Sequence, residues 1–343
     1  MPTINRGDDY FQVVTYTGNG STNTITGLRF QPDFVWIKGR SGATDHALYD
    51  AVRGTTKDLV SNSTAAETTQ STGLTSFNSD GFTLGALSKV NTNAATYVAW
   101  CWKANGAGSS NTSGSITSTV SVNTTAGFSI VTYTGTGANA TVGHGLGVAP
   151  KMIIIKGRST AFDWAVYHAS LGNTTTILLN SSGAALAPQS FFWQNTTPTS
   201  SVIYLGSWAE LNASSATQVA YCWAEIAGFS RFGSYTGNGS TDGTFVYTGF
   251  RPEFIMFKRT NDVSDWNILD TTRSPYNTSI TRLWANSSNA ENSSAVNYDI
   301  DILSNGFKQR NTNTSTSSNS NLNGSTYIFM AFAENPFKNS LAR

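Results

Sequence analysis

Apolar and polar positions alternate with a period of two along most of the chain. Phe11, Val13 and Thr15 alternate with Gln12, Val14 and Tyr16, and the run from Phe34 to Ile37 is short, β-branched and aromatic. Both patterns are typical of β-strands. Turn-forming dipeptides such as Asp80-Gly81 and Asn305-Gly306 separate these runs. Because no helical stripe is longer than about two turns, the pattern predicts an all-β fold.

The same succession of motifs occurs three times. A Tyr-Thr-Gly turn is followed by an apolar run that begins after a proline and ends in a lysine, and an aromatic-rich strand closes each copy. The Tyr-Thr-Gly turns begin at Tyr16, Tyr133 and Tyr235, and the closing strands lie at 97–102, 219–223 and 327–332. Internal repetition of this kind indicates repeated structural units.

The sequence therefore predicts three tandem β-sandwich-like repeats of about 100 residues each. Their expected bounds are an N-terminal arm at 1–10, repeat one at 11–104, a Gly/Ser/Asn/Thr linker at 105–118, repeat two at 119–227 and repeat three at 228–343. Both faces of each closing strand are apolar, which predicts that this strand lies in the middle of a sheet.

Composition excludes several classes of partner. Charged residues make up 12 % of the chain, and 21 basic against 20 acidic residues give a net charge of +1. A chain with this balance lacks the basic surface that nucleic acid binding requires. No apolar stretch approaches the ~20 residues of a membrane helix, and the first eleven residues carry no hydrophobic signal region. We expect neither nucleic acid binding nor membrane insertion, and synthesis in a cytoplasm.

The titratable residues predict no catalytic centre, cofactor or metal site. His46, His144 and His168 fall in no metal-ligand or catalytic spacing, and His46 aligns with a tryptophan in the other two repeats, which favours a packing role. Cys101 and Cys222 occupy the same position in repeats one and two. Equivalent positions in separate cores rarely form a disulfide, so both are expected to be buried and reduced.

A lysine and an aspartate recur seven positions apart in every repeat, as Lys38 and Asp45, Lys156 and Asp163, and Lys258 and Asp265. A catalytic role would be unusual for three identical sites in one chain. The spacing instead predicts cross-strand ion pairs that fix the register of a hairpin, with a structural role.

One irregular segment occurs in this form only in repeat two. Phe191, Phe192 and Trp193 precede Asn195, and an aromatic face beside amide groups can stack on a sugar ring and bond its hydroxyls. These residues are the sequence's candidate for contact with a glycan or a protein partner. The alternative is that the aromatic side chains pack in the core.

The motifs as a whole resemble a known family. Tyr16 to Ser21, Phe30 to Lys38, Ser79 to Phe82 and Tyr97 to Lys103 resemble a repeated domain of uncharacterised function in virion structural proteins of tailed phages, especially those of marine bacteria. The ending from Ala331 to Phe337 resembles the terminal copy. Repeat two departs most, since it lacks the Asp-Gly-Phe turn and has Lys151 after its proline.

The resemblance implies a non-enzymatic structural protein displayed on a phage particle, as a tail or tail-fibre component that acts in adsorption. A capsid decoration protein on the head surface is the alternative. A polysaccharide-degrading tailspike is a third hypothesis. Such an enzyme would need a pair of catalytic carboxylates, which the sequence does not offer. The expected partners are other virion proteins, further copies of the chain and a host surface glycan, with the N-terminal arm or repeat one as the end that attaches.

Overall fold

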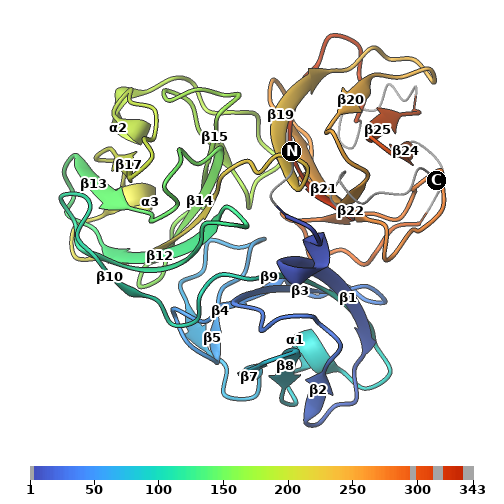
Figure 1. Ribbon diagram of the computed structural model, residues 1–343, viewed down its shortest axis with the longest axis horizontal. Helices are drawn as coiled ribbons and strands as arrows, with labels where there is room; N and C mark the ends of the chain where they lie inside the picture. Colours follow the sequence, from blue (N-terminus) through green and yellow to red (C-terminus); the bar gives the residue numbers. More distant parts are fainter. Residues whose placement is uncertain (1–3, 294–298, 312–319, 335–343) are drawn as a thin grey trace.

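The computed structural model describes residues 4–293, 299–311 and 320–334, and the described part is nearly all β, which confirms the predicted fold class. Three lobes surround a common centre (Figure 1). We define lobe 1 as residues 4–104, lobe 2 as 105–227 and lobe 3 as the described residues from 228 to 334. Residues 1–3 of the predicted arm and 335–337 of the family motif lie outside the described residues.

Lobe 1 is a sandwich of a large and a small sheet. The large sheet has the order β1 (Phe11–Thr17), β9 (Thr96–Trp102), β3 (Phe34–Gly39) and β4 (Ala47–Asp50). The small sheet has the order β2 (Asn23–Ile25), β8 (Gly81–Leu84) and β7 (Leu74–Asn78). The remaining elements are η1 (Gly7–Asp9), β5 (Lys57–Asp58), β6 (Thr68–Thr69) and α1 (Ser88–Asn91).

Lobe 2 has a wider large sheet. Its order is β10 (Ser109–Asn111), β11 (Ser118–Asn123), β12 (Phe128–Thr134), β18 (Thr217–Trp223), β14 (Met152–Gly157), β15 (Ala165–His168) and β16 (Ile177–Leu178). The small sheet pairs β13 (Ala140–Gly143) with β17 (Val202–Leu205), beside α2 (Ser190–Trp193) and α3 (Ala209–Asn212).

Lobe 3 repeats the plan. Its large sheet has the order β19 (Ser230–Thr236), β26 (Thr326–Ala333), β21 (Pro252–Arg259), β22 (Asn267–Asp270) and β23 (Leu283–Trp284). The small sheet has the order β20 (Phe245–Tyr247), β25 (Gly306–Gln309) and β24 (Ile300–Leu303). In all three lobes the closing strand lies inside the large sheet, between the first strand and the strand that carries the repeated lysine, and both of its faces are buried.

The register of the closing strands gives the correspondence between lobes. Trp100 lies opposite Trp36, Tyr221 opposite Ile154 and Met330 opposite Met256. Trp100, Tyr221 and Met330 are therefore equivalent by strand order and register. A superposition of three whole repeats remains a prediction.

Each large sheet buries both of its faces. One face packs on the small sheet of its own lobe, with Val35, Phe82 and Tyr97 in the core of lobe 1. The other face of all three sheets contributes to a single central core. Rings from different lobes meet there, since the centroid of Phe34 lies 4.3 Å from that of Tyr221, and Phe11 lies 4.9 Å from Phe332. The lobes are therefore joined by a shared apolar core rather than strung on linkers.

The predicted linker at 105–118 is wrong over part of its length. Ser109–Asn111 forms β10, which pairs with β11, and β11 in turn pairs with β12. The wholly polar side chains of β10, Ser-Ser-Asn, leave no apolar alternation for a sequence pattern to detect. Lobe 2 therefore carries two additional edge strands.

The N-terminal arm is also different from the prediction. Ile4 is buried in the central core, and the ring of Tyr10 lies 6.2 Å from that of Phe229 in lobe 3. An added Cβ on Gly7 would lie 3.0 Å from the carbonyl oxygen of Ala333. From residue 4 onward the arm packs against lobe 3, because its apolar side chains find partners in a distant part of the chain.

Candidate functional site

The repeated Tyr-Thr-Gly turn is held to the segment before the closing strand, which is a short helix in lobes 1 and 2. In lobe 1 the Tyr16 hydroxyl donates to the carbonyl oxygen of Val90 at 2.8 Å, and an added Cβ on Gly18 would lie 2.2 Å from the Thr92 carbonyl. The buried amide of Asn91 accepts from the backbone of Asn19 and donates to the carbonyl of Gly85. The turn is therefore a structural element of the fold.

The same contacts occur in the other lobes, where Asn212 and Asn321 accept from the backbone of Thr136 and Asn238. Sequence reasoning missed these three asparagines because they lie among many other asparagines. Their signal is their constant place, five residues before the first residue of each closing strand, at 91, 212 and 321.

The three repeated lysines connect the lobes. Lys38 in lobe 1 donates to the carbonyl of Ser288 in lobe 3 at 3.2 Å, and Lys156 in lobe 2 donates to that of Thr64 in lobe 1 at 2.9 Å. Lys258 in lobe 3 completes the cycle through a 2.9 Å bond to a carbonyl of lobe 2. Each amine also donates to a carbonyl of its own lobe.

The predicted ion pairs are therefore wrong, since none of the three lysines lies within 4 Å of its aspartate. Asp45, Asp163 and Asp265 instead accept from the side-chain amides of Asn62, Asn180 and Asn286, each at 2.7 Å. Spacing along one strand pair could not show that carbonyls of the next lobe surround each amine. Burial lowers the pKa of each lysine to about 8, and the aspartate partly offsets this effect.

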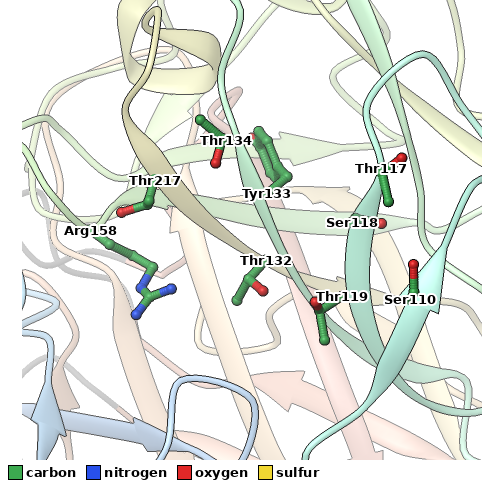
Figure 2. Close-up of a pocket in the computed structure, with 9 residues that line it drawn as sticks. All are labelled: Ser110, Thr117, Ser118, Thr119, Thr132, Tyr133, Thr134, Arg158 and Thr217. Atoms are coloured by element: carbon green, nitrogen blue, oxygen red, sulfur yellow. The ribbon is translucent and has the colours of Figure 1, made fainter.

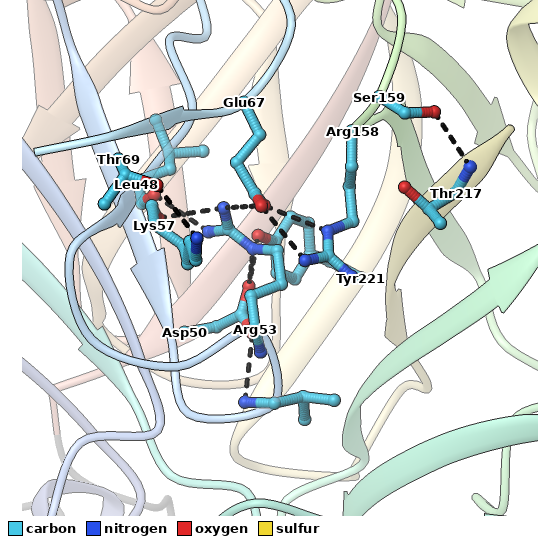
Figure 3. A network of polar contacts seen from close by, with 11 residues as sticks. Leu48, Asp50, Arg53, Lys57, Glu67, Thr69, Arg158, Ser159, Thr217 and Tyr221 are labelled. Atoms are coloured by element: carbon cyan, nitrogen blue, oxygen red, sulfur yellow. Dashed lines mark hydrogen bonds and ion pairs between the residues drawn. The ribbon is translucent and has the colours of Figure 1, made fainter.

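A buried network of charges joins lobes 1 and 2 (Figure 3). Arg53 donates through Nε to Asp50 and through Nη1 to Glu67 at 3.1 Å. From lobe 2, Tyr221 donates its hydroxyl to Asp50 at 2.7 Å, and Arg158 donates from Nε and Nη2 to the two oxygens of Glu67. Burial alone would raise the pKa of Glu67, but its bonds from Arg158 and Arg53 hold that pKa below its usual value.

An equivalent network joins lobes 3 and 1. Arg273 donates to Asp270 at 2.6 Å and to Glu291 at 2.9 Å. From lobe 1, the Trp100 indole donates to Asp270 at 3.0 Å, and Arg40 donates to both oxygens of Glu291. Trp100 and Tyr221 are the equivalent residues of two closing strands, so the two networks use the same five positions.

The interface between lobes 2 and 3 has neutral residues at all five positions. They are His168, Leu171, Ala185, Thr260 and Met330. His168 contacts the carbonyl of Phe329 at 3.1 Å. The backbone N–H of Ala185 donates to the Thr260 carbonyl at 2.8 Å. The equivalent bonds in the other two interfaces run from Glu67 to Arg158 at 2.8 Å and from Glu291 to Arg40 at 2.9 Å, so the five positions correspond in all three. All five residues of the charged network are thus present in two interfaces, and all five are replaced by neutral residues in the third.

The histidines and cysteines have packing roles. The indole of Trp36 donates to His46 Nδ1 at 2.8 Å, so the opposite nitrogen carries the proton that bonds to the carbonyl of Trp284. Trp164 and Trp266 also donate to carbonyls of a neighbouring lobe, as their alignment with His46 suggests. Cys101 and Cys222 are buried, unpaired and in different cores, and burial raises the pKa of both thiols.

The aromatic segment predicted for glycan contact is mostly core. Phe192 and Trp193 are buried, and the Trp193 indole donates to the carbonyl of Thr175 at 3.2 Å. Phe191 is 39 % exposed and packs edge-on against Phe192, while Asn195 is exposed. The tryptophan face is therefore unavailable for stacking on a sugar.

A pocket of about 250 Å³ opens beside the additional strands of lobe 2 (Figure 2). Its wall consists mainly of hydroxyl-bearing side chains on neighbouring strands, among them Ser110, Thr119 and Thr132. The one cation, Arg158, is held by Glu67. No exposed aromatic ring lines this pocket, so it offers hydrogen bonds without a stacking surface.

The described residues contain neither a metal-binding cluster nor a membrane-spanning helix. No group of three or more His, Cys, Asp or Glu side chains there could hold a metal ion. Within the same residues, no helix has the length and apolar character to cross a membrane.

The fold and its interfaces define an all-β protein in which three β-sandwich lobes share one core. The chain belongs to the family of a domain of unknown function, DUF7483, whose model matches residues 6–336. The match spans all three lobes. A comparison with curated proteins finds no match.

Proposed function

We propose that the protein is a non-enzymatic structural component on the surface of a phage particle, where it acts as a tail or tail-fibre element in adsorption to the host. The observation that carries this proposal is that the buried charged residues bind one another across the interfaces between lobes. The clusters around Asp50 and Asp270 are bound by arginines and join one lobe to the next. They join the lobes into one block, and two members that reach a pocket wall, Arg158 and Glu291, are bound by their partners in the network.

The family resemblance of the repeated motifs supports a place on a virion. The surface chemistry is compatible with it, because a nearly neutral protein rich in Ser, Thr and Asn depends little on charge interactions that seawater salt would screen.

A capsid decoration protein is the second candidate. Three lobes around a shared core present three similar outer surfaces, and such a block suits a position of threefold symmetry on a shell. A trimeric partner at the end of a tail fibre would offer the same symmetry, so the two candidates share this argument.

Electron microscopy of intact particles labelled with gold-conjugated antibody tests the proposal. Label on the tail supports the first candidate, and label over the head supports the second. Absence of the protein from purified particles would overturn both. Release of oligosaccharide from host envelope by the purified protein would contradict the non-enzymatic assignment.

A further inference from the structure

Strand β20 of lobe 3 presents two exposed aromatic side chains. Phe245 is 42 % exposed and Tyr247 is 60 % exposed, while Val246 between them is buried. The equivalent strands of the other lobes, β2 and β13, carry no aromatic residue. Among these three equivalent strands, the pair of exposed rings therefore occurs in lobe 3 alone.

A glycine lies against each of the two rings. An added Cβ on Gly249 would lie 3.4 Å from the Tyr247 hydroxyl oxygen, and Gly249 has a φ of +86°, which favours glycine. An added Cβ on Gly306 would lie 3.0 Å from the ring of Phe245. A side chain at Gly306 would press on the Phe245 ring and on the Val246 carbonyl, whereas the distance at Gly249 is an ordinary van der Waals contact.

Tyr247 lines a pocket of about 250 Å³ together with Glu225, Arg231 and Thr248. Arg231 donates to one oxygen of Glu225 at 2.7 Å, and the backbone of Phe232 donates to the other at 3.2 Å. Each carboxylate oxygen keeps acceptor capacity, and Arg231 keeps N–H donors. The Tyr247 hydroxyl makes no hydrogen bond within the described residues. The pocket thus combines an exposed ring with fixed donors and acceptors and has no net charge.

We propose that this pocket binds a neutral saccharide. The apolar face of a pyranose would stack on Tyr247, and two adjacent hydroxyls would bond to the Glu225 and Arg231 pair. A carboxylated sugar fits less well because it would face Glu225. The volume lies just below that of drug-sized ligand pockets, so a single ring unit of a longer glycan is the expected occupant.

The two other candidate surfaces lack this combination. The hydroxyl-lined pocket of lobe 2 has no exposed ring, and the segment at 190–195 buries Trp193. This inference rests on the proposed role in adsorption, because it names the class of ligand that the adsorbing protein would bind. Binding is measured on the purified protein, so a negative result there leaves the labelling of particles unaffected, and the reverse also holds.

Saturation-transfer NMR with the methyl glycosides of glucose, galactose and N-acetylglucosamine tests the proposal. We expect at least one glycoside to bind the full chain, and Tyr247→Ala to weaken binding about tenfold or more. Tyr247→Trp keeps a stacking face and should retain binding, while Arg231→Gln should weaken it.

Phe191→Ala is the matched control, since it removes an exposed ring from the segment that the sequence favoured, and it should bind like wild type. Thermal unfolding of each variant checks that the fold is intact. Failure of all three glycosides to bind wild type would overturn the proposal. Equal binding by wild type and a folded Tyr247→Ala variant would also overturn it.

Discussion

Arg158 of lobe 2 binds both carboxylate oxygens of Glu67 in lobe 1, with N–O distances of 2.9 and 3.0 Å. Arg40 of lobe 1 binds Glu291 of lobe 3 in the same two-point geometry, at 2.9 and 2.8 Å. Two parallel bonds fix orientation as well as distance. These pairs therefore set the angle between lobes, while the central core joins the inner apolar faces of the three large sheets.

Removal of one charge from a buried network should be strongly destabilising. Asp50→Asn leaves the fully buried Arg53 without its nearest carboxylate, and we expect a loss of about 3–5 kcal/mol in unfolding free energy. Asp8→Asn breaks a partly exposed ion pair with Arg6 and a longer one with Arg29, and it should cost less than about 1 kcal/mol. Denaturant titration of both variants measures the difference, and equal losses would contradict this role of the network.

Exchange of the whole network should be tolerated where single changes are not. The replacement set copies the interface of lobes 2 and 3 into that of lobes 1 and 2, as Asp50→His, Arg53→Leu, Glu67→Ala, Arg158→Thr and Tyr221→Met. Because a buried ionic network can be replaced by apolar groups at little net cost, we expect stability within about 2 kcal/mol of wild type. The sum of the losses in unfolding free energy from the five single substitutions should be far larger. An additive result would refute the idea that these positions act as a set.

The buried lysines should produce a pH dependence of known sign. The folded pKa of Lys156 is about 8, below its usual value of about 10.4, so between these values the unfolded chain binds more protons than the folded one. Stability therefore rises with pH across this window. Relative to Lys156→Met, wild type should become more stable from pH 7 to pH 10, and Lys258→Met should give the same trend. A flat or falling difference in both variants would argue against buried, charged amines.

The asparagine behind the Tyr-Thr-Gly turn should matter more than its neighbours. Asn91→Ala removes the bonds to the backbone N–H of Asn19 and to the carbonyls of Ser21 and Gly85, and we expect a total loss of roughly 1–3 kcal/mol in unfolding free energy. Asn93→Ala, two residues along and exposed, should change stability by less than about 0.5 kcal/mol. Thermal melts of the two variants compare them directly. Similar melting temperatures would show that the turn does not depend on Asn91.

The sequence predicted the structural features that depend on the local pattern of apolar and polar residues. Strand positions, the buried closing strand around Trp100 and the burial of Cys101 follow from alternation and residue type. The match of His46 with two tryptophans also predicted a shared packing position, and each of the three residues contacts a carbonyl of a neighbouring lobe.

The errors concern contacts between distant parts of the chain. Lys38 was paired with Asp45 because both belong to one hairpin, whereas its carbonyl partner Ser288 lies 250 positions away. Strand β10 was missed because backbone pairing alone holds it. The exposure of Tyr247 could not be predicted, because residue type does not show which side of a short strand faces solvent. Physical constraints that arise only after the lobes assemble leave little trace in a single sequence.

The central claim is that three lobes form one cooperative block around the core that contains Phe34, Trp102, Trp223 and Phe332. Differential scanning calorimetry of the full chain tests this claim most directly. A single block predicts one transition whose calorimetric enthalpy equals its van't Hoff enthalpy. Two or more resolved transitions, or a calorimetric enthalpy about three times the van't Hoff value, would show that the lobes unfold independently and would contradict the account.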